Sequence, residues 1–477
     1  MTADEFRRHG HEMIEWIARY YADMENRPVQ AQSAPGELKA LLPPNAPFEP
    51  ENFDRILADM DTLILPHLTL WQHPRFFGYF PSNSLGAGVL GDLMSTALGV
   101  LGISWQSSPA VTEVEEIVVD RFRQMVDLSS NWFGVINDTA STSTLVALLC
   151  AREKATDYSM ARGGMQAEER HLAIYTSASA HSSVMKAALL AGFGRDYVRL
   201  IETDGEFAMR PEALQDAIAG DVAQGRLPCA VVATVGGTAT TSIDPVREIA
   251  AIAGRQKLWL HVDAAMAGNA MILPECRWMW AGIEAADSLA INAHKWLGVP
   301  FDCSLYFTRD EAHLIRVMST NPAYLQSEAD GKVRNLRDAG IPLGRRFRAL
   351  KMWFLIREQG VSGLQARLRR DLDLAQQLAA KITKQDHWHI IAPVVLQTVC
   401  VRFEPPALPR QMIDQFTRDW ASAINASGEA YVTPATADGR WMVRISIGSA
   451  STRASDVEAI WDLMQAKVKQ TLLSYPS

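Results

Sequence analysis

The stretch Ile291-Asn292-Ala293-His294-Lys295-Trp296-Leu297-Gly298 follows a short apolar run that begins at Ser288. An apolar run that ends in Asn, His and Lys is typical of a strand whose carboxyl end delivers polar side chains to a ligand site. Lys295 lies between a histidine and a tryptophan, and partly apolar surroundings favour the neutral, nucleophilic form of an amine. A neutral amine condenses with aldehydes, the first step of Schiff-base catalysis. Most lysines at strand ends only keep a charged head in water, so the role of Lys295 depends on the rest of the chain.

The composition is that of a large globular protein. The 477 residues are 48% hydrophobic and 21% charged, which predicts one large domain with smaller appendages. A net charge of −8 argues against nucleic acid and anionic membranes as main partners. The five cysteines are scattered and contain no CxxC pair, which predicts a reducing compartment, no disulfide framework and no metal site. We expect a cytoplasmic protein, because the charged start is unlike a signal peptide and no apolar run reaches the length of a membrane span.

The middle of the chain, from about residue 85 to 310, alternates helical segments with short apolar runs. Runs that are apolar throughout indicate strands covered on both faces, and hence a mostly parallel α/β sheet. The clear strand candidates are residues 172–175, 230–235, 258–262, 288–291 and 304–307. Helices are expected between them, such as residues 144–154, 183–191 and 211–219.

Three parts are predicted along the chain. Residues 1–84 form a helical arm with a Pro-rich segment and no core of its own, which we expect to pack on a partner subunit. Residues 85–360 form the large domain, and residues 361–477 form a small α+β domain. A long helical pattern opens near residue 344 and another follows beyond about residue 365.

Asp263 follows the apolar run at residues 258–262 and precedes several small residues. The end of a buried strand is a costly place for an anion that has no cationic partner. A protonated pyridine nitrogen would be such a partner, and the small residues would leave room for a flat ring. For this residue taken alone, an aspartate that caps the next turn is the simpler explanation.

Two further segments begin helices with polar residues. Thr139-Ala140-Ser141-Thr142-Ser143-Thr144 places hydroxyls and free N–H groups at a helix N-terminus, which suits either a phosphate or an ordinary cap. His181 begins another helix and could cap it or stack on a ring. The chain has no Gly-rich nucleotide loop, so a phosphate on a small cofactor fits better than ATP or NAD. An aldehyde-reactive lysine, an acid, a phosphate cradle and an imidazole are what pyridoxal 5′-phosphate (PLP) requires of a protein.

The motifs NAHKW followed by FDCS, HVDAAMAG, AHSSV, DTASTSTLVAL and GYFPSN resemble those of the PLP-dependent group II decarboxylases. The resemblance runs nearly end to end and is closest to the aromatic-L-amino-acid decarboxylases, especially bacterial ones that act on L-DOPA. It implies a fold-type I architecture, with a mostly parallel seven-stranded sheet between helices and a small C-terminal α+β domain. It also implies a homodimer whose active site lies at the interface.

The resemblance implies a role for each matching residue. Lys295 would hold PLP as a Schiff base, Asp263 would pair with the pyridinium nitrogen, and His181 would stack on the ring. Tyr324 matches the loop tyrosine that protonates the substrate carbon. The phosphate and its surroundings would be contacted by Ala140, Ser141, Thr238, Asn292 and His294. The substrate pocket would take His181, Trp71, Tyr79, Phe80, Pro81 and Ser82, with Leu101 and Ile103 from the other subunit.

The activity that the resemblance implies is decarboxylation of an aromatic L-amino acid to its amine. L-DOPA is the first expected substrate, and tryptophan, 5-hydroxytryptophan, tyrosine and phenylalanine are the others. One alternative is a PLP-dependent synthase that converts the amino acid oxidatively to an aldehyde, but such relatives tend to lack Tyr324 or His181. Another is a non-catalytic dimeric relative, against which Lys295, Asp263 and His181 argue.

Some residues depart from the family pattern. Asn137-Asp138-Thr139 replaces a more usual Gln-Gly-Ser, Gly237 replaces a Thr, and Met266 stands where an aromatic is common. These departures leave fine substrate preference and phosphate geometry open. A basic cluster looks like a nucleic-acid patch in isolation, but on a helix between domains we expect ion pairs and packing. Its members are Arg345, Arg346, Arg348 and Lys351.

Overall fold

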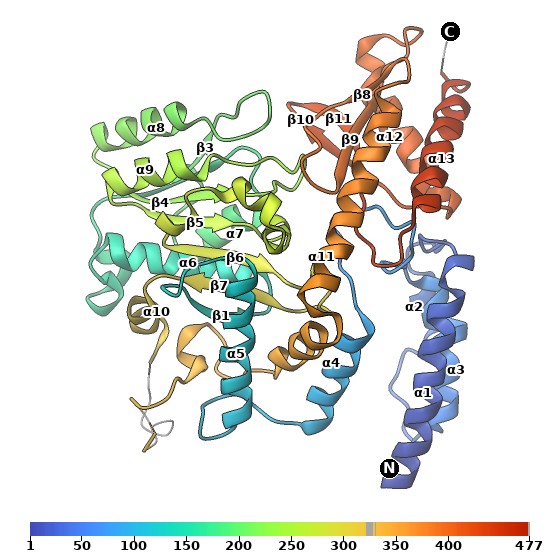
Figure 1. Ribbon diagram of the computed structural model, residues 1–477, viewed down its shortest axis with the longest axis horizontal. Helices are drawn as coiled ribbons and strands as arrows, with labels where there is room; N and C mark the ends of the chain where they lie inside the picture. The colour runs from blue at the N-terminus through green and yellow to red at the C-terminus, as the bar shows by residue number, and fades with distance from the viewer. Residues whose placement is uncertain (321–327, 330, 476–477) are drawn as a thin grey trace. The chain divides into compact units, whose positions relative to one another are not determined.

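The computed structural model describes residues 1–320, 328–329 and 331–475. Within these residues the chain divides into two compact units (Figure 1). Unit 1 comprises residues 1–81, 377–390 and 399–477, and unit 2 comprises residues 82–376 and 391–398. Tyr324 lies outside the described residues. The three-part division at residues 84 and 360 stays a prediction.

Unit 2 is built on a seven-stranded sheet in the order β1-β7-β6-β5-β4-β2-β3. β2 pairs in parallel with β3 and β4, β4 with β5, and β5 with β6. β7 is antiparallel to both β6 and β1, so every strand except β7 runs in one direction. The strands are β1 (Phe133–Asn137), β2 (Leu172–Ser177), β3 (Val198–Ile201), β4 (Leu227–Thr234), β5 (Trp259–Asp263), β6 (Ser288–Asn292) and β7 (Ser304–Thr308). The predicted mostly parallel α/β sheet is confirmed.

Burial explains the apolar sequence of these strands. Every residue of β2, β5, β6 and β7 is buried, which requires cover on both faces of the sheet. The connecting helices provide it, and Figure 1 shows them packed around the sheet. They include α6 (Ala140–Ala155), α7 (Ser182–Leu190), α8 (Pro211–Ala223) and α9 (Val246–Gln256).

Two strands, β1 and β3, were absent from the sequence prediction. β3 has only four residues and is interrupted by Arg199, so it lacks a continuous apolar run. β1 contains Gly134, a residue disfavoured in strands. A Cβ at Gly134 would lie 2.3 Å from Val119 Cγ1 and 2.6 Å from Phe307 Cε1, so close packing requires glycine there.

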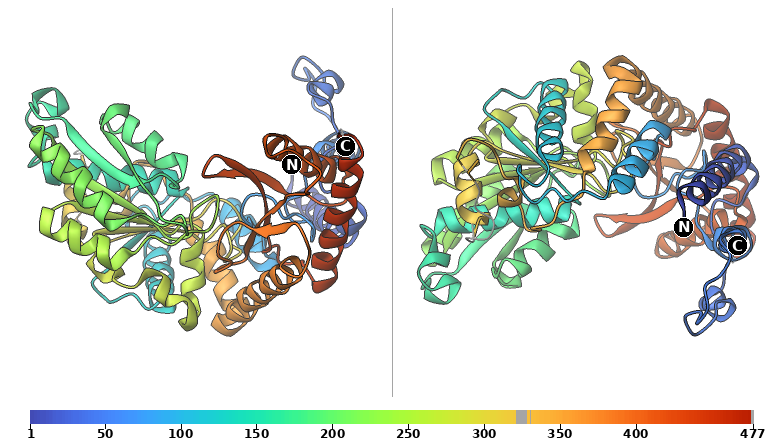
Figure 2. Two further views of the ribbon diagram at one scale, coloured as in Figure 1. Left: turned by 90° about the horizontal axis from the view of Figure 1, so that it is seen from above. Right: turned by 90° about the horizontal axis from the view of Figure 1, so that it is seen from below.

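Unit 1 contains a four-stranded sheet in the order β10-β11-β9-β8. Trp388 of β8 contacts Trp420 of α12 and Trp461 of α13, with ring centroids 5.9 and 5.1 Å apart. Both helices therefore cover the same face of this sheet (Figure 2). The elements are β8 (Trp388–Ile390), β9 (Thr398–Phe403), β10 (Thr433–Ala437), β11 (Arg440–Ser446), α12 (Arg410–Ser427) and α13 (Ala454–Leu472).

The N-terminal segment folds with the C-terminal segment inside unit 1. Its helices include α1 (Ala3–Asp23), α2 (Glu37–Leu41) and α3 (Phe53–Asp59). Val29 N donates to Gly428 O at 2.8 Å, and Phe77 N donates to Tyr431 O at 2.8 Å. These backbone bonds explain how a segment that is poor in core residues of its own is ordered.

Three longer helices complete the chain: α4 (Gly86–Leu98), α5 (Pro109–Met125) and α11 (Arg348–Ile382). α11 is interrupted at Gly360, whose φ of 61° is not helical, so the two helical patterns seen in the sequence correspond to its two halves. The shorter α10 (Glu311–Met318) follows β7. Among the described residues, no helix combines the length and the apolar character needed to cross a bilayer.

The basic cluster of residues 345–351 is engaged in ion pairs, as expected. Arg346 and Lys351 both face Asp92, at 3.3 and 3.5 Å. Arg348 pairs with Asp302 at 2.8 Å. The buried Arg345 bonds the buried Glu115, whose carboxylate also accepts the Ile136 N–H of β1 at 2.8 Å. The cluster therefore joins α11 and the preceding loop to the sheet.

Replacing Glu115 with Ala should lower the free energy of unfolding by about 3–5 kcal/mol, because the buried Arg345 guanidinium would lose its counter-charge. Chemical denaturation of the purified variant measures this loss. Arg346→Ala removes a half-exposed partner and should cost less than about 1 kcal/mol. Equal losses in the two variants would contradict a buried, structural role for the Glu115–Arg345 pair.

Candidate active site

The predicted cofactor-binding residues gather at one edge of the sheet in unit 2. Asp263 is the last residue of β5, and Lys295 follows the end of β6. His181 follows β2, Thr238 follows β4, and Ala140 begins α6 directly after β1. Because these strands run in one direction, their carboxyl ends share an edge. The topology therefore brings together five segments that are distant in the sequence.

Asp263 is a buried carboxylate, with 6% of its surface exposed. Its Oδ1 accepts the Ala265 N–H at 3.1 Å, the turn-capping contact that the sequence also allowed. No second hydrogen bond to its carboxylate is found within the described residues. A buried anion with one neutral donor is poorly stabilised, so the site suits a bound cation such as a pyridinium.

The surroundings of Asp263 are small and apolar. Ala140, Ala265 and Ala290 contact one another where α6, β5 and β6 meet. None of them has a side chain longer than a methyl group, so a flat ring would meet little steric obstruction there. This agrees with the expectation drawn from the HVDAAMAG motif.

His181 is the N-cap residue of α7. Its Nδ1 accepts the Ser183 N–H at 3.1 Å, which leaves the proton of a neutral ring on Nε2. The pKa of His181 lies below its usual value, first because of partial burial and also because of the Lys295 ammonium, while Asp263 opposes the shift. His181 is thus within electrostatic range of both Asp263 and Lys295. The capping role is confirmed, and stacking on a ring stays a prediction.

An anion site is available at the start of α6. Thr139 is its N-cap residue but makes no side-chain bond to the helix, so the first N–H groups are not capped by it. Ser141 is exposed beside them. Asn292, at the end of β6, has a buried side-chain oxygen with no hydrogen-bond partner among the described residues. The uncapped N–H groups and the Ser141 hydroxyl are donors that fit a phosphate, whereas the Asn292 oxygen is an acceptor and would contact a donor instead.

His294 is held as a neutral donor. Its Nδ1 accepts the Cys303 N–H at 2.8 Å, so the proton of the ring is on Nε2. Burial, aided by the Lys295 charge, lowers the pKa of His294 to about 4. A neutral ring with a free Nε2–H can donate to a phosphate oxygen at any pH well above 4.

Lys295 is half-buried, and its backbone is fixed. Its N–H donates to Asn292 O at 3.0 Å. On one side, Ser82 Oγ donates to His294 O at 3.3 Å. On the other, Trp296 is completely buried. Ser82 is therefore next to the lysine segment, and its role at the carboxylate or phosphate end stays a prediction.

The predicted aromatic residues belong to unit 1. Trp71 and Tyr79 are stacked, with ring centroids 5.2 Å apart. Tyr79 has a φ of 50°, a left-handed conformation uncommon for a residue with a side chain, and its N–H donates to Thr433 Oγ1 at 2.7 Å. Arg444 lies over the Phe80 ring at 4.9 Å, and Pro81 is buried. This segment is therefore rigidly held by C-terminal residues.

The sequence did not single out several supporting residues. Tyr431 stacks on Phe76 with centroids 5.2 Å apart, and its hydroxyl lies 3.2 Å from that of Tyr79. Asn269 Nδ2 donates to Asn292 O at 3.1 Å and to Met266 O at 2.8 Å. Such residues act through long-range contacts and carry no local signal in a sequence.

Two of the departures from the family pattern have a structural reason. A Cβ at Gly237 would lie 2.4 Å from Ser242 Oγ, so a threonine could not replace this glycine without a shift. Met266 is buried, and its sulfur accepts from Gln397 Nε2 at 3.3 Å. Met266 is therefore part of the packed interior of unit 2.

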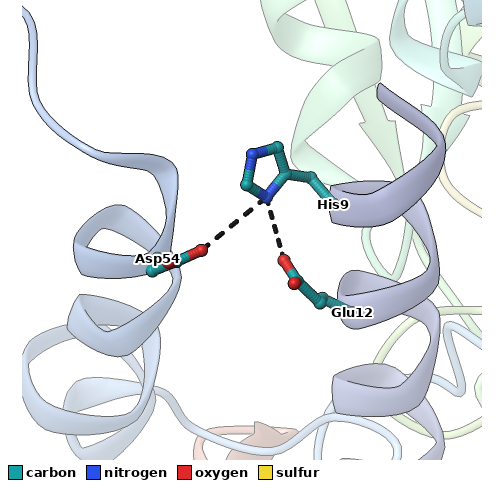
Figure 3. Close-up of side chains that lie close together, drawn as sticks. All are labelled: His9, Glu12 and Asp54. Carbon is teal, nitrogen blue, oxygen red and sulfur yellow. Dashed lines mark hydrogen bonds and ion pairs between the residues drawn. The ribbon is translucent and has the colours of Figure 1, made fainter. Parts of the chain in front are cut away.

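A cavity and a polar cluster are formed by residues other than the predicted cofactor-binding ones. A cavity of about 300 Å³ near residues 240–248 is lined by none of the predicted cofactor residues. Figure 3 shows His9, Glu12 and Asp54, a cluster that could hold a metal ion and that joins α1 to α3. His9 Nδ1 lies 2.9 Å from Glu12 and 3.7 Å from Asp54, while Arg8 Nη2 lies 3.0 Å from Nε2. The adjacent guanidinium disfavours a cation there, so we interpret the cluster as a polar contact between helices.

Known proteins resemble the whole chain. The pyridoxal-dependent decarboxylase conserved domain matches residues 35–404. The chain is 39% identical over 478 residues to aromatic-L-amino-acid decarboxylase of Bos taurus, covering 98% of this chain and 96% of the relative. It is 38% identical over 482 residues to phenylacetaldehyde synthase of Arabidopsis thaliana, covering 99% and 97%. The crystal structure of Oryza sativa TDC with PLP and tryptamine matches with a TM-score of 0.96 and 34% identity, covering 98% of this chain and 99% of that one.

These similarities agree with the strand-end site. The poorly stabilised carboxylate of Asp263 suits the ring nitrogen of PLP. The uncapped start of α6 and the neutral donor His294 suit its phosphate. The chain belongs to the pyridoxal-dependent decarboxylase family and is a PLP-dependent carboxy-lyase.

Proposed function

We propose that this protein decarboxylates aromatic L-amino acids to the amine and CO2, with L-DOPA as the first substrate to test. The observation that carries the proposal is the convergence of Lys295, Asp263 and His181 at one sheet edge in a chain of this family. Relatives named for tryptophan, tyrosine and aromatic amino acids in general support the substrate class. We also propose that the protein works in the cytoplasm.

When bound, PLP supplies an electron sink for the carbon that loses its carboxylate. Lys295 would anchor the cofactor and give way to the substrate amine. Asp263 would keep the ring nitrogen protonated, because a buried carboxylate favours a nearby cation. His181 would cover the ring face, and Tyr324 would return a proton to the substrate carbon.

The remaining residues would hold the cofactor and orient the substrate. His294 would donate its Nε2–H to the phosphate, with Ser141, Ala140 and Asn292 around the same group. Thr238 would lie near the cofactor. The stacked rings of Trp71 and Tyr79, with Phe80 and Pro81, would form the apolar wall for the substrate, and Ser82 would face its carboxylate or the phosphate end.

The active form would be a homodimer. α4 and the loop after it expose a row of apolar side chains, of which Leu90 is 51% and Leu101 59% exposed. A contiguous apolar face of this kind marks an association surface. Leu101 and Ile103 would then reach the partner's site, and the N-terminal arm would lie across the partner.

Asp263→Ala should keep some bound cofactor but lower kcat on the order of a hundredfold or more, the usual cost of removing one electrostatic stabiliser. Steady-state kinetics with cofactor content measured in parallel tests this. Glu248→Gln, which removes an exposed carboxylate from α9, serves as the control. A kcat close to that of the unmutated protein would refute the electron-sink role.

The products distinguish decarboxylation from aldehyde synthesis, which an aldehyde synthase among the relatives makes a real alternative. The unmutated protein should yield amine from L-DOPA, tryptophan, 5-hydroxytryptophan, tyrosine or phenylalanine, and kcat/KM across the five identifies the preferred one. Tyr324→Phe should shift the products toward aldehyde, because the proton donor is removed. Stoichiometric aldehyde and H2O2 from the unmutated protein would overturn the proposal.

Leu90→Glu should weaken the dimer and make activity depend on protein concentration, because a charge would be desolvated at the interface. Val222→Glu is the matched control, since Val222 is 53% exposed but lies on α8. Sedimentation and activity over a dilution series measure both. A fully active monomer would contradict the shared site.

A further inference from the structure

Two charged residues of α11, Arg367 and Asp371, hold the segment that directly follows Lys295. They are four residues apart and so lie on the same face of the helix. Asp371 Oδ2 accepts the indole N–H of Trp296 at 2.8 Å. Arg367 Nη2 donates to the carbonyl oxygens of Trp296 and Leu297, at 2.7 Å each.

These contacts are buried. Trp296 and Asp371 are completely inaccessible, and Arg367 is 9% exposed. Arg370 donates to Asp371 Oδ1 through Nε at 3.0 Å and Nη2 at 2.7 Å, so both carboxylate oxygens accept hydrogen bonds. The pKa of Asp371 lies above its usual value, because burial outweighs the opposing effects of Arg370, Trp296 and Arg367. Burial also lowers the pKa of Arg367 to about 10, which leaves it charged at neutral pH.

The arrangement is costly for a purely structural contact. Two other nitrogens of Arg367, Nε and Nη1, are buried and have no hydrogen-bond partner among the described residues. Apolar side chains of similar volume would join α11 to this segment without taking charges out of water. What the charged pair adds is direction, since it fixes an indole N–H and two carbonyl oxygens in defined positions.

The neighbouring backbone is fixed as well. Lys295 N–H donates to Asn292 O at 3.0 Å, on the other side of the lysine. Gly298 has a φ of 97°, and a Cβ there would lie 2.7 Å from Leu85 Cδ1. The backbone is therefore constrained on both sides of Lys295, so its flexible side chain starts from a fixed point.

We propose that Arg367 and Asp371 are positioning residues for Lys295. By fixing residues 296 and 297, they aim the amine at the strand-end edge, where it meets the aldehyde of the cofactor. Preorganisation of this kind speeds the approach of the amine without any contact to the reacting atoms. The inference rests on the proposed role of Lys295 and extends it to α11.

The test uses the full-length protein stripped of PLP and then given PLP again. Asp371→Leu and Trp296→Phe should each slow the appearance of the visible absorbance of lysine-bound cofactor by roughly tenfold, the effect of losing one hydrogen bond to a charged group. The double variant should be no slower than the slower single variant, because the hydrogen bond between the indole and Asp371 is already lost in each single variant. Borohydride trapping and mass spectrometry of the Lys295 peptide give a second readout.

Three further variants separate positioning from stability. Asp371→Asn keeps an acceptor for the indole and should recover most of the rate. Arg367→Met, which removes the donor to both carbonyl oxygens, should slow cofactor capture as Asp371→Leu does. Arg369→Met is the control, because Arg369 pairs with Glu275 where both side chains are about half exposed. Circular dichroism corrects each rate for the folded fraction, and Trp296→Phe carries the test if Asp371→Leu does not fold.

The outcomes distinguish the inference from the proposed function. If the folded variants capture cofactor at the unmutated rate and only the melting temperature falls, the contacts are structural and the inference is overturned. If Lys295→Ala still develops the absorbance and the trapped adduct, the proposed anchor is wrong. If Lys295→Ala loses both while Asp371→Leu and Trp296→Phe behave as the unmutated protein, only the positioning role fails.

Discussion

A carboxylate at the end of a fully buried strand is the constraint on which the proposed site depends. Asp263 has little exposed surface, and a single backbone N–H is the hydrogen-bond donor found for it among the described residues. Ionised carboxylates in such surroundings are stable only with a positive partner. The ring nitrogen of the family's cofactor would supply one, so in the proposed site an under-satisfied acid of the protein would stabilise the protonated form of that ring.

The topology of the sheet places the other predicted site residues near Asp263. Six of its seven strands run in one direction, and those ending near Asp263 supply a lysine, an imidazole and a helix N-terminus at the same edge. Two histidines close to Lys295 share much of their surroundings. Burial and the Lys295 charge lower the pKa of both, and a backbone N–H donates to Nδ1 of each. Their acidic neighbours differ, since Asp263 opposes the shift of His181 and Asp302 opposes that of His294, and we propose different tasks for the two rings.

Patterns of burial made part of this predictable from sequence. Five strands of the large sheet are continuous apolar runs because both faces are covered, and the motif residues follow their ends. β1 and β3 lack such runs, because β1 contains Gly134 and the four-residue β3 contains Arg199. The ion pairs of residues 345–351 were expected in kind, but their partners, such as Glu115, are set by tertiary contacts alone. The same holds for Tyr431 and Asn269, whose importance follows only from what lies beside them.

The position of the reactive amine illustrates why local sequence is insufficient. A lysine side chain has four rotatable bonds, and no motif around residue 295 determines where its nitrogen points. Direction comes from α11, whose residues lie about 70 positions further along the chain and contact the backbone that follows Lys295. A residue type can therefore be recognised as suitable for chemistry from its neighbours in sequence. Its geometry is set by charges that only the folded chain brings next to it.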